Sequence, residues 1–181
     1  MTRQTTLARL MRAMIKYDGG DVPRIQHFVK VHDFARTIGV AEGLADEELF
    51  VLEAAAILHD VGIHAAEAKY GNCTGRYQEE LGPAEARKVL TETGGFDEVQ
   101  TERICWLIAH HHTYTGVVSK DHRILLEADF LVNSFEDQVS KEGIIAFREN
   151  VFRSESAISM LNDMWGLSSL QENHNEQNNL I

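Results

Sequence analysis

The chain has few of the residues that build disulfide-rich or loop-rich proteins. Its 181 residues include two cysteines and two prolines. Cys73 and Cys105 are too few for a disulfide framework and form no Cys-x-x-Cys pair, so we expect reduced thiols. Because proline interrupts the chain at only two places, long helices can form over most of its length.

Long apolar runs are also missing. No segment approaches the run of about eighteen apolar residues that a membrane span needs. Residues 1–16 mix arginine and lysine into an apolar pattern and lack the apolar block of a signal peptide. The sequence therefore predicts a cytoplasmic protein that does not use a membrane.

Positive charge is scarce, with 17 basic against 28 acidic residues and a formal net charge of −11. Proteins that bind long nucleic acids neutralise phosphates with clustered lysine and arginine. We find no such cluster and expect no long nucleic acid as a partner. A small phosphorylated ligand is compatible with this charge if a metal and a few local cations hold it. A homodimer is also compatible with the sequence.

Apolar residues recur at helical spacing throughout, without the sustained alternation that is typical of strands. With 44% hydrophobic residues, the chain can fill one core. We predict a single all-α domain. Its expected parts are an N-terminal helix packed on the domain (1–20), a core (21–136), C-terminal helices of the same domain (137–167) and a polar tail (168–181) that we expect to be flexible.

Glycine and proline give the expected helix ends. Gly19–Gly20 ends the first helix, and Pro83 is expected to open a helix that stops at Gly94–Gly95. The predicted helices are 3–17, 21–43, 46–60, 64–70, 83–93, 97–110, 121–135, 142–152 and 154–165.

An apolar helix ends in His59-Asp60, just before Gly62. Neighbouring side chains on a regular helix point about 100° apart. They can therefore reach one ion only where the backbone is turning. An imidazole beside a carboxylate suits a borderline or hard divalent ion. The alternative is a His–Asp hydrogen bond that caps the helix.

Asp129 lies inside a strongly apolar helix. A buried carboxylate is costly, so Asp129 requires a cation, a donor network or a proton. The alternative is a pair with an arginine or lysine of another helix. Glu127 lies about 200° away around the same helix and is expected to face solvent.

Two histidines of the second helix compete for a functional role, because His27 and His32 both flank its apolar stripe. His32-Asp33 is a second His-Asp dipeptide, but it lies in mid-helix, where its two side chains diverge. We therefore interpret His32 as a structural or surface residue.

Taken in order, His27, His59-Asp60 and Asp129 resemble the H…HD…D signature of the HD superfamily. Arg24, His27, Val31 and Ala35 resemble the first-histidine helix of that family, which favours His27 over His32. The resemblance covers residues 21–136. It implies an orthogonal helical bundle that holds a divalent metal ion (Fe, Mn, Ni, Co or Zn) through these four residues. It also implies hydrolysis of a phosphoester by an activated water.

The resemblance also indicates a second ion. In two-metal branches of the family a histidine near the end of the following helix binds it, which here favours His111, then His110, with Glu80 as a further candidate. Those branches also carry a histidine before a glycine, whereas Leu81 precedes Gly82 in this chain. The alternative is that the histidines at 110–112 are partly exposed and bind no ion, and that the helix dipole favours them at the C-terminus of the helix.

We expect Asp60, His64 and His111 to take part in catalysis. The phosphate candidates are Lys69, Arg76, Lys120 and Arg123. The substrate class implied is a small nucleotide or phosphorylated metabolite. Two alternatives remain: a di-iron oxygenase, which needs more histidine ligands, and a catalytically silent metal-binding regulatory module.

Overall fold

The computed structural model describes residues 2–117 and 119–167, and this part of the chain forms helices and no strand. The predicted all-α class is confirmed. Residues 168–181, for which a flexible tail is predicted, lie outside the described residues. The helices are α1 (Arg3–Tyr17), α2 (Val22–Ala41), α3 (Asp46–Leu58), α4 (Ile63–Tyr70), α5 (Gly75–Thr93), α6 (Glu98–Ile108), α7 (Lys120–Glu136), α8 (Lys141–Val151) and α9 (Glu155–Trp165).

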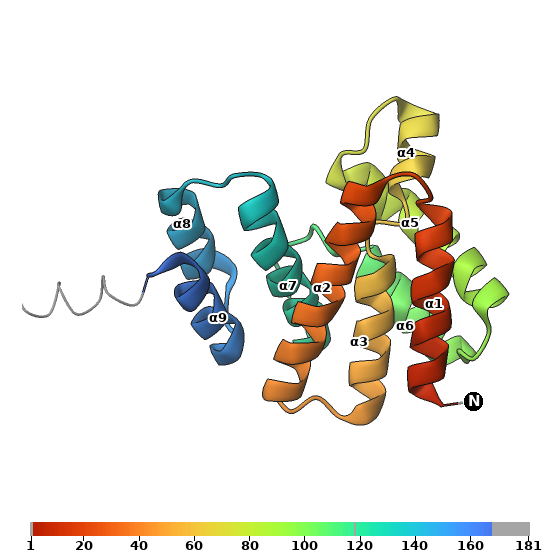
Figure 1. Cartoon of the computed structure of the whole chain (residues 1–181), viewed down its shortest axis with the longest axis horizontal. Coiled ribbons are helices and arrows are strands. Elements are labelled where there is room, and N and C mark those ends of the chain that lie inside the picture. Colours follow the sequence, from red (N-terminus) through yellow and green to blue (C-terminus); the bar gives the residue numbers. More distant parts are fainter. Residues whose placement is uncertain (1, 118, 168–181) are drawn as a thin grey trace, which may run out of the picture.

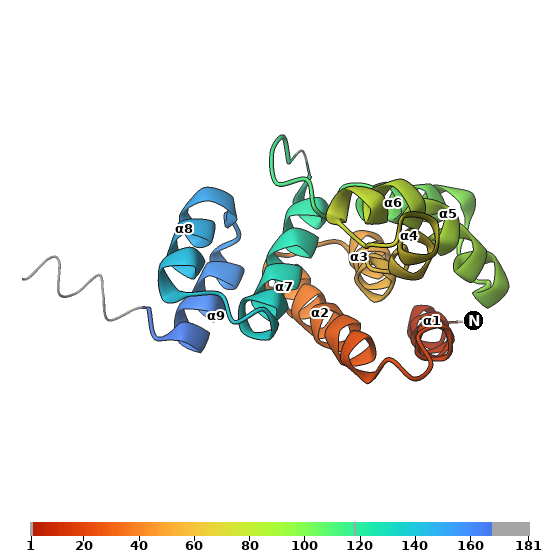
Figure 2. The same ribbon diagram turned by 90° about the horizontal axis from the view of Figure 1, so that it is seen from above.

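Three helices form the middle of the bundle. Helix α2 packs against both α3 and α7 (Figures 1 and 2). Helices α1, α4, α5 and α6 lie on one side of them, and the α8–α9 pair lies at the other end of the molecule. Apolar side chains from these layers are fully buried in one core, among them Leu10, Ile38, Leu52, Ile57, Leu107 and Ile124.

Side-chain caps explain why several helices begin where the sequence predicts. The Asp21 carboxylate accepts the Arg24 backbone N–H at 3.1 Å and starts α2. The Asp97 carboxylate accepts the Gln100 backbone N–H, and the Gln100 side-chain oxygen accepts the Asp97 backbone N–H. These bonds satisfy backbone donors that the first helical turn leaves open.

The predicted start of the fifth helix is wrong. Pro83 does not open α5 but lies inside it, and the helix begins at Gly75. Proline removes one backbone hydrogen bond of a helix. Helix α5 continues through that position because it packs against both α4 and α6.

A close backbone contact joins α5 to the end of α3. A Cβ atom on Gly62 would lie 2.8 Å from both Gln78 O and Gly82 N. Glycine at 62 therefore lets two backbones approach where no side chain fits. This contact places the start of α5 beside the turn that carries His59 and Asp60.

By length and composition alone, the stretch Asp46–Tyr70 is apolar enough to cross a membrane, with a mean hydropathy of 1.5. However, 78% of that apolar window is buried inside the protein. Packing in the core accounts for such a composition, so it is weak evidence for a membrane span.

Candidate metal centre

The His59-Asp60 pair lies where α3 stops. Helix α3 ends at Leu58, and the chain turns through Val61 N to Leu58 O and Ile63 N to Asp60 O bonds of 2.9 and 3.0 Å. The turn brings the adjacent side chains together, with His59 Nε2 3.4 Å from Asp60 Oδ2. His59 is buried, whereas the Asp60 side chain stays about a quarter exposed. The pair can therefore reach both the interior and solvent.

His27 of α2 and Asp129 of α7 complete the cluster. His27 Nε2 lies 3.1 Å from His59 Nε2 and 3.2 Å from Asp129 Oδ1. It also lies 3.6 Å from Asp60 Oδ2, and His59 Nε2 lies 3.5 Å from Asp129 Oδ1. Side chains from three separate parts of the sequence thus meet at one point.

The five distances between the imidazole nitrogens and their neighbours, 3.1–3.6 Å, are close to those of donor atoms around one ion. Donor atoms bound at about 2.1 Å, with angles of about 90–110° between the bonds, lie about 3.0–3.4 Å apart. His27, His59 and Asp60 also form a group whose ligand atoms all lie within 4.8 Å of one another. Two imidazoles and two carboxylates are a suitable donor set for several divalent metals.

Hydrogen bonds orient the two imidazoles toward the same point. His59 Nδ1 donates to the Ala56 carbonyl at 2.9 Å. His27 Nδ1 lies 2.7 Å from the Glu136 carboxylate, which itself pairs with Lys30. A neutral imidazole that donates from Nδ1 keeps a lone pair on Nε2. The two Nε2 atoms face each other at 3.1 Å, so either a proton or a metal ion must lie between them.

Charge at the cluster favours a cation too. Burial alone would raise the pKa of Asp60. The charge of His59, together with hydrogen bonds from His111 and His59, holds it well below its ordinary value instead. Burial would also raise the pKa of Asp129, but His27 and His59 lower it. Both carboxylates are therefore ionised at neutral pH. Asp129 Oδ1 is moreover buried with no hydrogen-bond partner among the described residues.

The histidine pKa values show the same attraction. Burial lowers the pKa of His27 and of His59, but the Asp60 and Asp129 carboxylates outweigh it and raise both. In a metal-free protein, protons therefore occupy this point, and a metal ion would compete with them.

A second group shares Asp60. Asp60, His111 and His112 each offer a ligand atom, and these atoms lie within 4.8 Å of one another. Burial and the neighbouring His111 lower the pKa of His112 to about 4, so its ring is neutral at pH 7. Sequence analysis did not select His112, because the family resemblance favoured His111 and then His110.

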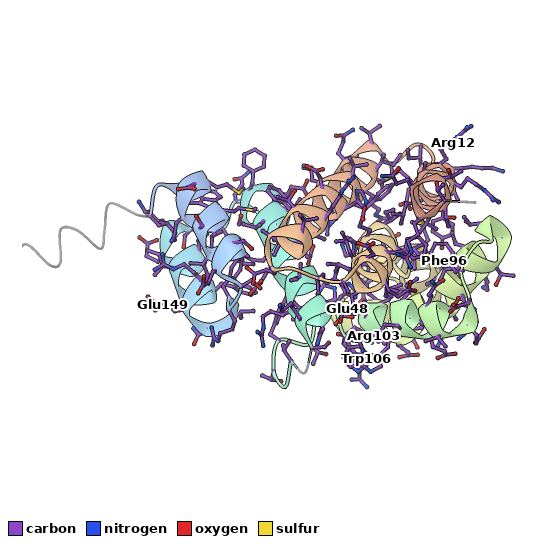
Figure 3. The ribbon with its side chains drawn as sticks, turned by 90° about the horizontal axis from the view of Figure 1, so that it is seen from below. Arg12, Glu48, Phe96, Arg103, Trp106 and Glu149 are labelled. Atoms are coloured by element: carbon purple, nitrogen blue, oxygen red, sulfur yellow. The ribbon has the colours of Figure 1, made fainter. Side chains whose placement is uncertain are left out.

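The other candidates for a second ion lie in different contacts. His110 stacks on Trp106 with ring centroids 4.2 Å apart, and its Nδ1 bonds to Trp106 O at 2.7 Å. Arg103 also lies over the Trp106 ring, with its guanidinium carbon 4.4 Å from the ring centroid; Figure 3 labels both residues. Glu80 bonds to Tyr70 and Lys69 at 2.6 and 3.2 Å. Neither His110 nor Glu80 belongs to a metal-binding group of the described residues.

His64 joins three helices near the cluster. Its Nε2 lies 2.8 Å from Asp18 Oδ1, and its Nδ1 lies 3.2 Å from the Arg24 guanidinium. Arg24 also pairs with Glu67 at 2.6 Å. Because both ring nitrogens are engaged, no lone pair is free for a base in this arrangement. A catalytic role of His64 stays a prediction.

The four phosphate candidates are spread over several elements. Lys69 pairs with Glu80, and Lys120 donates to Glu42 O at 2.9 Å. Arg76 lies in the first turn of α5, and Arg123 lines a small cavity of about 170 Å³ beside Tyr114. In the described part of the chain, none of these residues forms a hydrogen bond or ion pair with the cluster. Their role in phosphate binding stays a prediction.

For two residues outside the cluster, one sequence prediction agrees with the structure and the other does not. His32 binds Glu53 at 3.0 Å between α2 and α3, which agrees with the structural role predicted for it. The expectation that Glu127 faces solvent is wrong, because this side chain is fully buried. Its carboxylate accepts the backbone N–H groups of Arg153 and Ser154 at 2.6 and 3.0 Å, just before α9 begins.

Sequence reasoning also missed Glu136. This residue lies at the last position of α7, seven positions after Asp129, and so two turns further along the same helix face. That spacing is the signal that could have identified it as a partner of His27.

Comparison with known proteins gives one finding and one absence. The family model described as HD domain matches residues 24–134. A search of curated proteins finds no match. The match spans more than half of the chain and includes His27, His59-Asp60 and Asp129. The chain therefore belongs to the HD domain family, a superfamily of metal-dependent hydrolases.

Proposed function

We propose that this chain is a phosphohydrolase that cleaves a small phosphoester, either a nucleotide or another phosphorylated metabolite. One observation carries the proposal: the Nε2 atoms of His27 and His59 lie 3.1 Å apart, and each lies within 3.6 Å of an oxygen of Asp60 and of Asp129, at the positions of the family signature. An acidic surface with a formal net charge of −11 favours small anions over polynucleotides.

His27, His59, Asp60 and Asp129 would hold the ion. A divalent ion at this point lowers the pKa of water and polarises a phosphoryl oxygen. Iron, manganese, nickel, cobalt and zinc all suit the donor set.

Asp60 is the residue best placed to act on the water. Its side chain is the most exposed of the four, and its second oxygen, Oδ1, faces His111 at 3.5 Å. In the reaction, the water oxygen attacks phosphorus and the ester P–O bond breaks. Asp60 orients the water, and the proton released passes to the departing alkoxide or to solvent.

The proposal is tested by metal analysis and by a panel of phosphoesters, with Mn²⁺, Co²⁺, Ni²⁺, Mg²⁺ or Fe²⁺ supplied. We expect turnover with the intact chain. His59→Ala and Asp60→Ala should each lose both bound metal and turnover. Asp33→Ala changes the exposed aspartate of the other His-Asp dipeptide and is the matched control, which should retain both.

Other outcomes would replace the proposal. Turnover that survives in His59→Ala contradicts a role for the cluster in the reaction. A metal-loaded chain that cleaves no phosphoester supports a silent binding module. Two irons per chain together with oxygen consumption support an oxygenase.

A further inference from the structure

A cavity separate from the metal centre lies between α1, α2 and α3. Helices α1 and α2 both pack on α3, which lies between them (Figures 1 and 2). The volume of the cavity is about 480 Å³, within the range of about 300–1,000 Å³ that is typical of small-molecule sites. The residues that line it do not include His27, His59, Asp60 or Asp129.

The floor of this cavity is apolar. Leu7 of α1 and Phe50 and Ile57 of α3 line it, and all three side chains are buried. Met11 and Leu49 line it as well. Small-molecule sites have mainly apolar walls and a few polar groups that orient the ligand. The floor therefore fits an aliphatic or aromatic group of a small ligand.

A buried carboxylate with unused capacity lines the same cavity. Glu53 is 7% exposed and accepts one hydrogen bond, from His32 Nε2 at 3.0 Å. A carboxylate can accept several hydrogen bonds, and in the described part of the chain Glu53 receives no other. Replacement of a buried charged pair by apolar side chains is often neutral or stabilising. Stability alone therefore does not account for this pair, whereas a cationic ligand group beside Glu53 does.

A cation lies one helical turn further along α2. Arg36 follows His32 by four positions, so the Cβ atoms of the two residues are about 5–6 Å apart. Arg36 lines the cavity and forms no hydrogen bond or ion pair with any residue that the structure describes. Its planar guanidinium is suited to bind a carboxylate through two parallel hydrogen bonds. The other arginine of the cavity, Arg3, is already paired with Glu47.

We propose that this cavity binds a free α-amino acid with an apolar side chain. The carboxylate of the ligand binds Arg36, its ammonium group binds Glu53, and its side chain lies on the apolar floor. An amino acid carries its two charges close together beside one apolar group, which matches this arrangement. Asp46 also lines the cavity and disfavours a ligand that carries only negative charge. The site does not depend on the proposed phosphohydrolase activity.

The test is a calorimetric titration of the full chain, without added metal, with L-phenylalanine, L-leucine and L-methionine. At least one of them should bind, with one molecule per chain. For the amino acid that binds most tightly, the analogue without the ammonium group and the analogue without the carboxylate should each bind at least about tenfold more weakly. Each analogue loses hydrogen bonds between charged groups, and about 1.4 kcal/mol corresponds to tenfold in affinity. L-Serine, which lacks the apolar side chain, should not bind detectably.

Matched variants locate the ligand. Arg36→Gln and Glu53→Gln should each weaken binding at least about tenfold. Arg12→Gln changes an exposed arginine of α1 that does not line this cavity, labelled in Figure 3, and should leave the affinity unchanged. His59→Ala should also bind the amino acid as tightly as the intact chain, because the metal cluster is not part of this site. Circular dichroism verifies that each variant is folded.

Three results would overturn the inference: no binding of any of the three amino acids, equal binding of an analogue that lacks either charge, or unchanged affinity in a folded Arg36→Gln chain. Loss of binding in His59→Ala would also overturn it, because the ligand would then lie at the metal centre. If Glu53→Gln does not fold, the analogue without the ammonium group tests the same contact in the intact chain.

Discussion

The orientation of single imidazole rings determines what this cluster can bind. His27, His59 and His111 each direct Nδ1 to an acceptor outside the cluster, at 2.7, 2.9 and 2.7 Å. Two of these acceptors are carbonyls in the last turn of the histidine's own helix. Such acceptors move little, so the rings are oriented before an ion arrives. Only His27 depends on a side chain from another helix, namely Glu136.

Glu136→Ala tests the importance of that side chain. The loss of a hydrogen bond to a metal-ligating histidine lowers metal affinity by about 10- to 100-fold. We expect this loss for Mn²⁺ or Zn²⁺, measured by calorimetry at constant pH. Lys30→Met removes only the outer partner of Glu136 and should cost far less. If Glu136→Ala binds metal as tightly as the intact chain, the carboxylate does not orient His27.

At the scale of helices, the cluster depends on two contacts that hold elements in place. One is the close approach of Gly62 to Gln78 and Gly82, which sets α5 against the turn after α3. The other joins α6 to the start of α7, where Arg103 donates to both oxygens of Asp121 at 2.8 and 2.7 Å. The first contact positions the His59-Asp60 turn, and the second positions the helix of Asp129.

Gly62→Ala should destabilise the fold by about 1–3 kcal/mol, because its Cβ would overlap backbone atoms that cannot rotate away. It should also lower metal affinity, since the turn must shift. Gly143→Ala, in the outer helix α8, is the control, because its Cβ would meet only side-chain atoms, those of Val139 at 3.0 Å and Ser140 at 3.4 Å. Thermal unfolding measures both variants, and equal stability in the two would contradict the role of the Gly62 contact.

Asp121→Asn should reduce stability by about 1–3 kcal/mol at pH 7, as expected for hydrogen bonds to charged groups. Burial raises the pKa of Asp121, but Arg103 and Ser119 lower it below its ordinary value. The stabilisation is therefore complete above the unfolded pKa of about 4 and is lost as the pH falls through the folded value.

The difference in unfolding free energy between Asp121→Asn and the intact chain should therefore become smaller in acid. Urea unfolding at several pH values measures it. Glu98→Gln removes an exposed partner of Arg87 and should change stability little at any of these pH values, because water screens such a pair. A difference for Asp121→Asn that stays constant from pH 7 to pH 3 would contradict the role of the carboxylate charge.

At the scale of the whole molecule, sequence patterns predicted the helices well, because apolar periodicity and caps are local signals. Asp21 and Asp97 begin helices as their types indicate. Pro83 gave a wrong helix start because local rules place proline at the beginning of a helix. In the structure, packing against α4 and α6 stabilises α5 on both sides of the proline. Glu127 misled because its partners, the backbone of Arg153 and Ser154, lie far along the chain.

The candidate site was predictable in part for the same reason. The order of His27, His59-Asp60 and Asp129 is visible in the sequence, and the structure brings these four residues together. Glu136 and His112 gain their roles only through contacts between helices. No pattern of residue types along the chain indicates which carboxylate faces which imidazole.

The most direct test of the account is a crystal structure of the chain with Mn²⁺ bound, located by anomalous scattering. The account predicts a peak bound by His27 Nε2, His59 Nε2, Asp60 Oδ2 and Asp129 Oδ1, at about 2.1–2.2 Å from each. A well-ordered Mn²⁺ bound elsewhere, with these four side chains bonded only to one another, would contradict it.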